Sequence, residues 1–134
     1  MILADTSAWV EYDCATGSAI DQALASLIAE GGSHLAVTEP VLMEVLAGAK
    51  DEQRHSDLER LLKSFQWLAS DPIADFTGGS KAYRACRAGG VTPRGLIDCI
   101  IASIAIRTGA ELLAADRGFA DMARVILLRL AQGA

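Results

Sequence analysis

The sequence predicts an α/β fold in which helices cover both faces of a parallel sheet. Short apolar runs alternate along the chain with segments of helical periodicity, and this alternation is typical of strand–helix–strand units. The runs are apolar at consecutive positions, as expected of strands buried on both faces. With 134 residues, 51% of them hydrophobic, the chain is long enough for one domain with its own core. We therefore expect residues 1–134 to form a single domain.

Five apolar runs are expected to form the strands. The first ends at Asp5 and the fourth ends at Asp116, so a carboxylate follows each of them directly. The expected strands are residues 1–4, 34–37, 67–69, 112–115 and 125–130.

Capping residues and apolar faces mark the helices between these strands. Ser7 can cap the first helix, and Pro40 lies at the start of the third, where a missing N–H costs nothing. The pair Gly78-Gly79 weakens the helical pattern in the middle of the fifth. The expected helices are residues 8–12, 20–28, 40–47, 51–65, 72–87, 93–106 and 119–123.

The helix over residues 93–106 is the most informative of these. Thr92 is expected to be its N-cap and Pro93 its first residue. The segment is apolar all the way round, which predicts a helix buried on every side, yet Asp98 lies within it. An ionised carboxylate in a dry core needs a partner or a metal ion. The simplest partner is Arg94, four residues before Asp98.

Composition narrows the classes of protein that fit. A net charge of −5 argues against unspecific coating of nucleic acids but leaves room for a local basic rim. The longest apolar run is too short to cross a bilayer, and we find no secretory signal, so we expect a cytoplasmic protein without a membrane partner. Three cysteines without CxxC spacing predict buried thiols in a reducing compartment rather than disulfides or a zinc site.

Four carboxylates are expected to meet at one edge of the sheet. Asp5 and Asp116 follow strands, and the carboxyl ends of parallel strands are where ligands bind in open α/β sheets. Asp98 and Glu44 would lie at the same edge if their helices begin there. Carboxylates brought together repel one another, and a hard divalent cation such as Mg²⁺ or Mn²⁺ relieves this cost. Taken one at a time, the strand-end acids could be turn or cap residues, and Glu44 a solvated one.

The four acids lie in segments that together extend over most of the chain. In order, the segments are Ile2-Leu3-Ala4-Asp5-Thr6-Ser7, Thr38-Glu39-Pro40-Val41-Leu42-Met43-Glu44, Leu96-Ile97-Asp98-Cys99-Ile100-Ile101-Ala102 and Leu112-Leu113-Ala114-Ala115-Asp116-Arg117-Gly118-Phe119. This ordered set resembles the PIN-domain ribonucleases, in particular the toxins of the VapC type. The resemblance implies a three-layer α/β/α fold with a parallel sheet of about five strands in the order 3-2-1-4-5.

The resemblance also implies roles for individual residues. The implied catalytic acids are Asp5, Glu44, Asp98 and Asp116. Of these, Asp5, Asp98 and Asp116 would hold Mg²⁺, and Glu44 would act as a base or bind the metal through water. Thr6 or Ser7 would contribute a hydroxyl group at the substrate. Such proteins often carry a further Asp directly before the Phe of the last segment. This chain has Gly118 there, so a second metal ion is less well supported than the first.

The activity implied by this resemblance is Mg²⁺-dependent hydrolysis of RNA that leaves a 5′-phosphate and a 3′-hydroxyl. Arg94 and Arg117 are candidates for contacts with RNA phosphates, and internal salt bridges to the acids are the alternative. A cognate antitoxin and a homodimer are the implied partners. Trp9, Tyr12 and the amphipathic helices around residues 20–28 and 52–65 could line an apolar groove for the antitoxin, although aromatic residues at such positions are more often core.

Other classes of protein remain possible from the residues alone. A haloacid-dehalogenase-type phosphotransferase would need a second acid where this chain has Ser7. A response-regulator receiver could use Asp71 but would need a lysine late in the chain, and none follows Lys81. The third alternative is a non-catalytic PIN module that only binds RNA or a partner protein.

Overall fold

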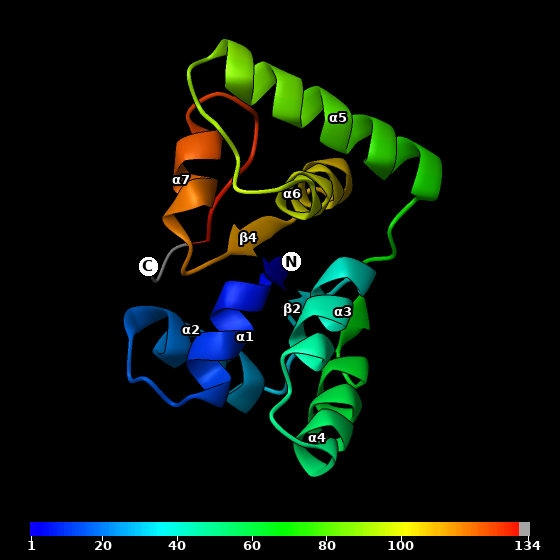
Figure 1. Cartoon of the computed structure of the whole chain (residues 1–134). Coiled ribbons are helices and arrows are strands. Elements are labelled where there is room, and N and C mark those ends of the chain that lie inside the picture. Colours follow the sequence, from blue (N-terminus) through cyan, green and yellow to red (C-terminus); the bar gives the residue numbers. More distant parts are fainter. Residues whose placement is uncertain (132–134) are drawn as a thin grey trace.

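The computed structural model describes residues 1–131, and Figure 1 shows how its elements are arranged. The strands are β1 (Ile2–Ala4), β2 (Leu35–Val37), β3 (Gln66–Trp67) and β4 (Glu111–Leu113). The helices are α1 (Thr6–Asp13), α2 (Ala19–Ala29), α3 (Glu39–Ala47), α4 (Glu52–Lys63), α5 (Pro72–Ala88), α6 (Leu96–Thr108) and α7 (Arg117–Ala123). No helix in this part of the chain is long and apolar enough to span a membrane.

The sheet is parallel, with the strand order β3-β2-β1-β4. This confirms the predicted fold class and the order of the first four strands. The expected strand over 125–130 was wrong in extent, because Leu130 forms only a single parallel bridge to Leu112 at the outer edge of β4. Upstream of that bridge, Val125 and Ile126 donate backbone hydrogen bonds to Met122 and continue the turn that ends α7. The backbone N–H groups of Val125 and Ile126 therefore bond within this turn and do not pair with β4.

The helices form two layers, as the connections between strands require. Parallel crossovers are right-handed, so the two that lead from β1 to β2 and on to β3 place α1–α4 on one face. The chain then reverses direction across the sheet to reach β4, which places α5 and α6 on the other face, and Figure 1 shows α7 beside them. The direction changes between β1 and β4, and such a switch point is where open α/β sheets bind ligands.

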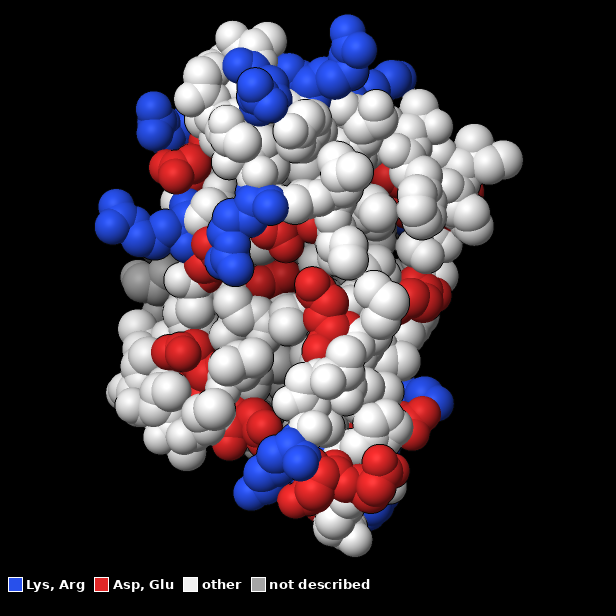
Figure 2. Space-filling view, in the orientation of Figure 1, with Lys and Arg blue, Asp and Glu red and all other residues white. Residues whose placement is uncertain are grey.

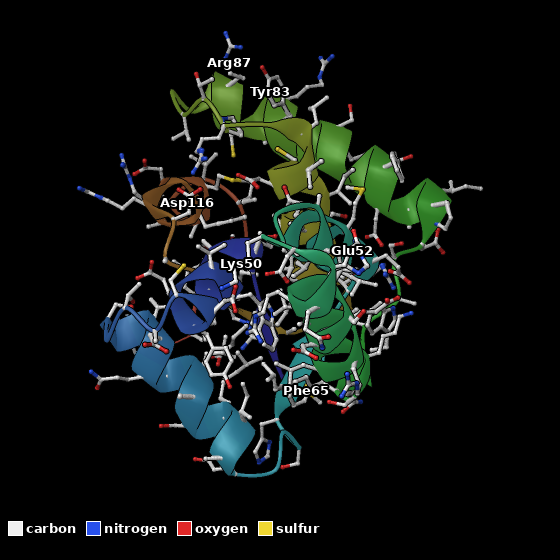
Figure 3. All side chains as sticks on the ribbon, turned by 60° about the horizontal axis from the view of Figure 1, so that its bottom comes forward. Lys50, Glu52, Phe65, Tyr83, Arg87 and Asp116 are labelled. Carbon is white, nitrogen blue, oxygen red and sulfur yellow. The ribbon has the colours of Figure 1, made fainter. Side chains whose placement is uncertain are left out.

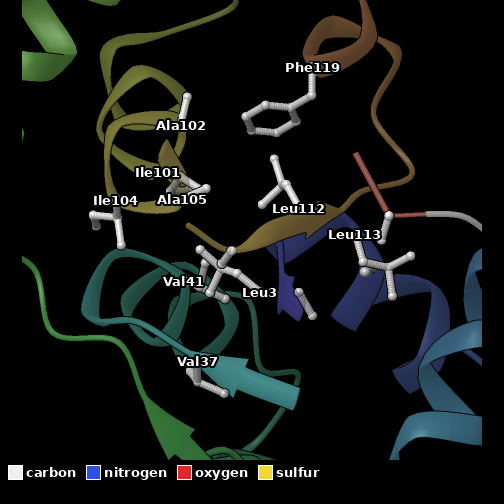
Figure 4. Close-up of a cluster of buried hydrophobic side chains, with 14 of the residues drawn as sticks. Leu3, Val37, Val41, Ile101, Ala102, Ile104, Ala105, Leu112, Leu113 and Phe119 are labelled. Atoms are coloured by element: carbon white, nitrogen blue, oxygen red, sulfur yellow. The ribbon is translucent and has the colours of Figure 1, made fainter. Parts of the chain in front are cut away.

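The core lies between the sheet and these helices (Figure 4). Leu3, Leu112 and Phe119 are among its fully buried side chains. Trp9 is buried as well and packs against Tyr12 and Phe65, with ring centroids 6.0 and 5.9 Å away. The favoured interpretation of Trp9 as a core residue is therefore confirmed, and the alternative, a place in an antitoxin groove, is not.

Helix α6 differs from the prediction at its start and on one side. It begins at Leu96 with Gly95 as its N-cap, so Thr92 and Pro93 belong to the preceding loop, where Pro93 is buried. The helix is also not enclosed on every side, since Leu96 is 60% and Ile106 39% exposed. No described element covers these side chains, whereas the face toward the sheet is fully buried.

Helix α5 runs without interruption through Gly78 and Gly79. Because these two residues have no side chain, α6 packs closely against α5. A Cβ on Gly79 would lie 3.2 Å from Ile100 Cγ1, and one on Gly78 would lie 2.2 Å from Ser103 Oγ. Close packing brings the fully buried Asp75 of α5 against Arg107 of α6, with Asp75 Oδ2 2.7 Å from Arg107 Nη2. This ion pair fixes α6 relative to α5.

Candidate active site

Asp5 follows β1 and caps α1. Its Oδ2 accepts hydrogen bonds from Ser7 N at 3.0 Å and Ser7 Oγ at 2.7 Å. The residue is only 3% exposed, and its other oxygen, Oδ1, is buried with no hydrogen-bond partner in the described chain. Burial raises the pKa of the Asp5 carboxyl, partly offset by the bonds from Ser7. One side of this carboxylate is therefore held rigidly, and the other is available for a ligand.

Ser7 joins the two turns that carry strand-end acids. Its hydroxyl donates to Asp5 and accepts from the backbone N–H groups of Ala115, at 2.9 Å, and Asp116, at 3.3 Å. It connects residues more than 100 positions apart across the switch point between β1 and β4. The geometry gives Ser7 a positioning role, which no spacing in the sequence indicated.

Asp116 follows the β4 segment and caps α7 (Figure 3). Its Oδ1 accepts from Gly118 N at 2.8 Å, and its Oδ2 is paired with Arg94 Nη1. The alternative interpretation of Asp98, a salt bridge with Arg94, is not observed, because α6 begins only after Arg94 and the helical spacing between the two residues does not exist. The internal salt bridge suggested for Arg94 does form, but with Asp116.

Asp98 lies in the first turn of α6, and the other acids act on it. Its pKa is raised to about 6, first by burial and then by the negative charges of Asp5, Asp116 and Glu44, while Arg94 lowers it. No hydrogen bond is formed by its carboxylate within residues 1–131. The structure therefore brings Asp5, Glu44 and Asp116 within electrostatic range of Asp98.

Glu44 approaches the same place from α3. Thr6 Oγ1, at the start of α1, donates to Glu44 Oε1 at 2.6 Å. Glu44, Arg94 and Asp98 line one open pocket of about 390 Å³. Figure 2 shows acidic side chains gathered in a hollow at the centre of this face, with basic side chains beside them.

The carboxylates are close but not assembled around a common point. Within residues 1–131, no three acidic, histidine or cysteine side chains are arranged to hold one metal ion. Three of the acids already have other partners: Ser7 for Asp5 Oδ2, Thr6 for Glu44, and Arg94 with Gly118 for Asp116. The unpartnered oxygens are Asp5 Oδ1 and those of Asp98. An all-oxygen, acidic set of this kind fits a hard divalent cation, and the buried Asp5 Oδ1 is the atom that most requires one.

The remaining predicted residues take different positions. Arg117 is exposed at the start of α7, and no ion pair to it exists in the described region. Asp71 caps α5 by accepting from Ile73 N and Ala74 N, the ordinary use of an aspartate before a helix. The ion pair between Asp75 and Arg107 was not foreseen, because Asp75 gave no signal that distinguishes it from a solvent-facing helix residue.

Known proteins of the same fold and similar sequence identify the family. The family model described as PIN domain matches residues 2–125. Over 131 residues the chain is 44% identical to Ribonuclease VapC11 of Mycobacterium tuberculosis and to VapC ribonuclease Mb1587 of Mycobacterium bovis, covering 98% of this chain and 98% of each relative. The chain belongs to the PIN-domain family, and its resemblance to the VapC type is confirmed.

Solved structures agree on the fold. VapBC2 from Rickettsia felis, bound to a DNA fragment from its promoter, aligns with a TM-score of 0.75 at 23% identity over 98% of both chains. Mycobacterium tuberculosis VapC20, described as a Sarcin-Ricin loop cleaving toxin, aligns with a TM-score of 0.67 at 18% identity, covering 96% of this chain and 99% of its own.

Proposed function

We propose that this protein is a Mg²⁺-dependent endoribonuclease and the toxin of a toxin–antitoxin pair. The observation that carries the proposal is the open side of the acid cluster, where buried Asp5 Oδ1 and the Asp98 carboxylate lack protein partners in the described chain. The relatives that match nearly the whole chain are named as ribonucleases, which supports RNA as the substrate.

Each residue of the cluster has a distinct role in this proposal. Asp5, Asp98 and Asp116 would hold the cation, which supplies charge neutralisation at the phosphate and a more acidic water when bound. Glu44, oriented by the Thr6 hydroxyl, would accept the proton of the attacking water. Ser7 keeps the turns that carry Asp5 and Asp116 in register.

The experiment that tests the function is incubation of the purified protein with a mixed pool of small RNAs, in Mg²⁺, in Mn²⁺ and in EDTA. We expect cleavage in either metal and none in EDTA, with 5′-phosphate and 3′-hydroxyl ends on the products. RNA that is bound but remains intact in every metal would favour the alternative, a non-catalytic PIN module.

The RNA is expected to lie across α5 and α7. Eight of the twelve Lys and Arg residues come after residue 80, against four of the seventeen acids. On α4 the cations are paired with acids, as in Arg60–Asp57 and Lys63–Glu59. On α5, within the described chain, Arg84 has no ion pair, and Arg87 only donates to Tyr83 Oη at 3.2 Å (Figure 3). Unpaired cations beside an aromatic ring are suited to single-stranded RNA.

Replacing Arg84 and Arg87 by Ala should therefore weaken RNA binding about tenfold or more and reduce its dependence on salt. The matched control is Arg60→Ala with Lys63→Ala, which removes the same charge from α4 and should leave RNA affinity nearly unchanged. Fluorescence anisotropy across a salt series measures both pairs. Equal losses in the two double variants would contradict a path over α5.

An antitoxin partner follows from the same proposal. Thirteen of the seventeen acids precede residue 81, which gives the α1–α4 side of the chain a strong negative charge. A basic and apolar segment would be complementary to this side. Inhibition of RNA cleavage by the co-purified partner is the direct test.

A second copy of the chain is the proposed cover for an apolar surface next to the acid pocket. Met43 and Phe76 are 56% and 62% exposed and line a cavity between α3, α5 and α6, and Leu96 at the start of α6 is 60% exposed. Leu96 also lines the pocket of Glu44 and Asp98, so a dimer formed here would bring two acid clusters to one groove.

Replacing Phe76 by Glu should convert this dimer to monomers. Ile73→Glu is the matched control, because Ile73 lies one turn earlier on α5 and is 82% exposed but does not line this cavity. Light scattering after size exclusion measures the mass of each. A Phe76→Glu protein that stays dimeric while Ile73→Glu dissociates would place the interface elsewhere.

A further inference from the structure

The side chain of Arg94 lies at the edge of the acid cluster and pairs with one of its members. It is paired with Asp116 Oδ2, and its positive charge lowers the pKa of Asp98, which the charges of Asp5, Asp116 and Glu44 raise. Arg94 itself is 73% exposed, whereas the Asp116 side chain is 13% exposed. The pair is therefore open to solvent on the arginine side and closed on the aspartate side.

The backbone around Arg94 allows this placement. Pro93 is buried and anchors the loop, and Gly95 follows in an extended conformation before α6 begins. The stem of Arg94 passes over Gly118, where a Cβ would lie 3.8 Å from Arg94 Cδ. A carboxylate at residue 118 would compete with Asp116 for the same guanidinium, so Gly118 leaves Asp116 as the partner of Arg94.

While Arg94 is paired with Asp116, both carboxylate oxygens of Asp116 have protein partners. Its Oδ1 is used by Gly118 N at 2.8 Å and its Oδ2 by the guanidinium. This accounts for the lack of any three acids arranged around one ion in residues 1–131, although the four acids share one neighbourhood. Asp5 Oδ1 and Asp98 remain open, so two of the three proposed ligands are ready and the third is held by Arg94.

We propose that Arg94 is a resident cation that closes the metal site by pairing with Asp116, and that a divalent ion binds by displacing it. Because this inference rests on the proposed metal centre, it concerns how that centre is regulated. Displacement leaves the guanidinium at the rim of the pocket, where a phosphate of the RNA is the anion available to it. The metal ion then takes the place of Arg94 beside Asp116, and the released guanidinium strengthens RNA binding.

Competition of this kind has a defined signature. The Arg94–Asp116 pair lowers the apparent affinity for the metal by a certain factor, and removing Arg94 should raise that affinity by the same factor. For a partly exposed pair we expect Arg94→Ala to bind Mg²⁺ and Mn²⁺ about three- to tenfold more tightly. An arginine that only supported the fold of the pocket would have the opposite effect, because its loss would loosen the ligands.

Isothermal titration of metal into the protein without RNA tests this, with wild type, Arg94→Ala, Arg94→Lys and Arg117→Ala compared. Arg117 adjoins the same aspartate and has no ion pair within residues 1–131, so Arg117→Ala removes an equal charge without opening the pair. We expect the tightest binding in Arg94→Ala, an intermediate value in Arg94→Lys, and a small change in Arg117→Ala.

The possible results of this titration distinguish the proposed role of Arg94 from the proposed metal centre on which it rests. Equal or weaker metal binding in Arg94→Ala, or the same gain in Arg117→Ala, would overturn the role of Arg94 and leave the metal centre intact. Absence of metal binding in wild type and in Arg94→Ala alike would overturn both. In RNA binding, measured with Ca²⁺ in place of Mg²⁺, Arg94→Ala should be weaker than wild type, opposite in sign to its effect on the metal.

Discussion

Replacing Asp98 by Asn should abolish metal-dependent RNA cleavage while making the metal-free protein more resistant to heat. Asp98 is the one proposed ligand whose carboxylate has no hydrogen-bond partner in the described chain, so its loss should reduce cleavage by at least about a hundredfold. The same group is repelled by Asp5, Asp116 and Glu44, which raise its pKa to about 6 together with burial. A neutral amide of the same shape removes this repulsion.

The pH dependence of stability provides a second readout for Asp98. A carboxyl whose pKa is higher in the folded than in the unfolded state binds more protons when folded, so the free energy of unfolding falls as pH rises. This loss occurs between the ordinary value of 3.8 and about 6. Metal-free wild type should therefore become less stable across this window relative to Asp98→Asn, and Mg²⁺ should restore wild type only.

Asp121→Asn is the matched control for this variant. Asp121 is an exposed acid on α7 with a 3.5 Å contact to Arg124, and its replacement removes the same charge outside the cluster. It should leave cleavage and the melting temperature nearly unchanged. Cleavage that survives in Asp98→Asn, or is lost equally in Asp121→Asn, would contradict the assignment.

Arg107→Ala should cause the largest loss of stability among single surface-accessible changes. Asp75 is completely buried, and Arg107 donates to both of its oxygens and to Ala69 O, while Ser103 Oγ donates at 3.0 Å. Burial alone would raise the pKa of Asp75, but the hydrogen bonds from Arg107, the Asp71 backbone and Ser103, together with the charge of Arg107, outweigh burial and lower the pKa. Without Arg107 the carboxylate remains buried and unpaired.

We expect this change to cost about 2–3 kcal/mol, or roughly 10 °C in melting temperature. Arg54→Ala is its control, because the Arg54–Asp13 pair is partly exposed on both sides and should contribute below about 1 kcal/mol. Chemical denaturation of both variants measures the difference. A similar small loss in the two proteins would show that the buried pair does not hold α5 and α6 together.

The fold was predictable because its signals are local. Apolar runs of three or four residues predict buried parallel strands, and the acids after β1 and β4 could be placed at one edge without coordinates. The edge bridge at Leu130 was overestimated as a strand, since an apolar sequence does not reveal whether its backbone is paired.

The site was predictable in composition but not in its pairing. Arg94 was offered as an alternative partner for Asp98 because helical spacing was extended through Pro93, whereas the chain remains extended until Gly95. The contacts of Ser7 and of Asp75 are between distant elements, and no pattern along the chain encodes them. Exposure of Leu96 and Ile106 was missed because an all-apolar helix does not show which of its faces the fold leaves uncovered.

The central claim is that the acids hold a divalent cation against the RNA phosphate that is cleaved. It is tested most directly by replacing a non-bridging oxygen of that phosphate by sulfur and comparing cleavage in Mg²⁺ and Mn²⁺. Sulfur is a soft ligand that Mn²⁺ tolerates better than Mg²⁺ does. We expect cleavage of one sulfur stereoisomer to be strongly slowed in Mg²⁺ and restored in Mn²⁺. Cleavage that is equally fast, or equally slow, in both metals would contradict it.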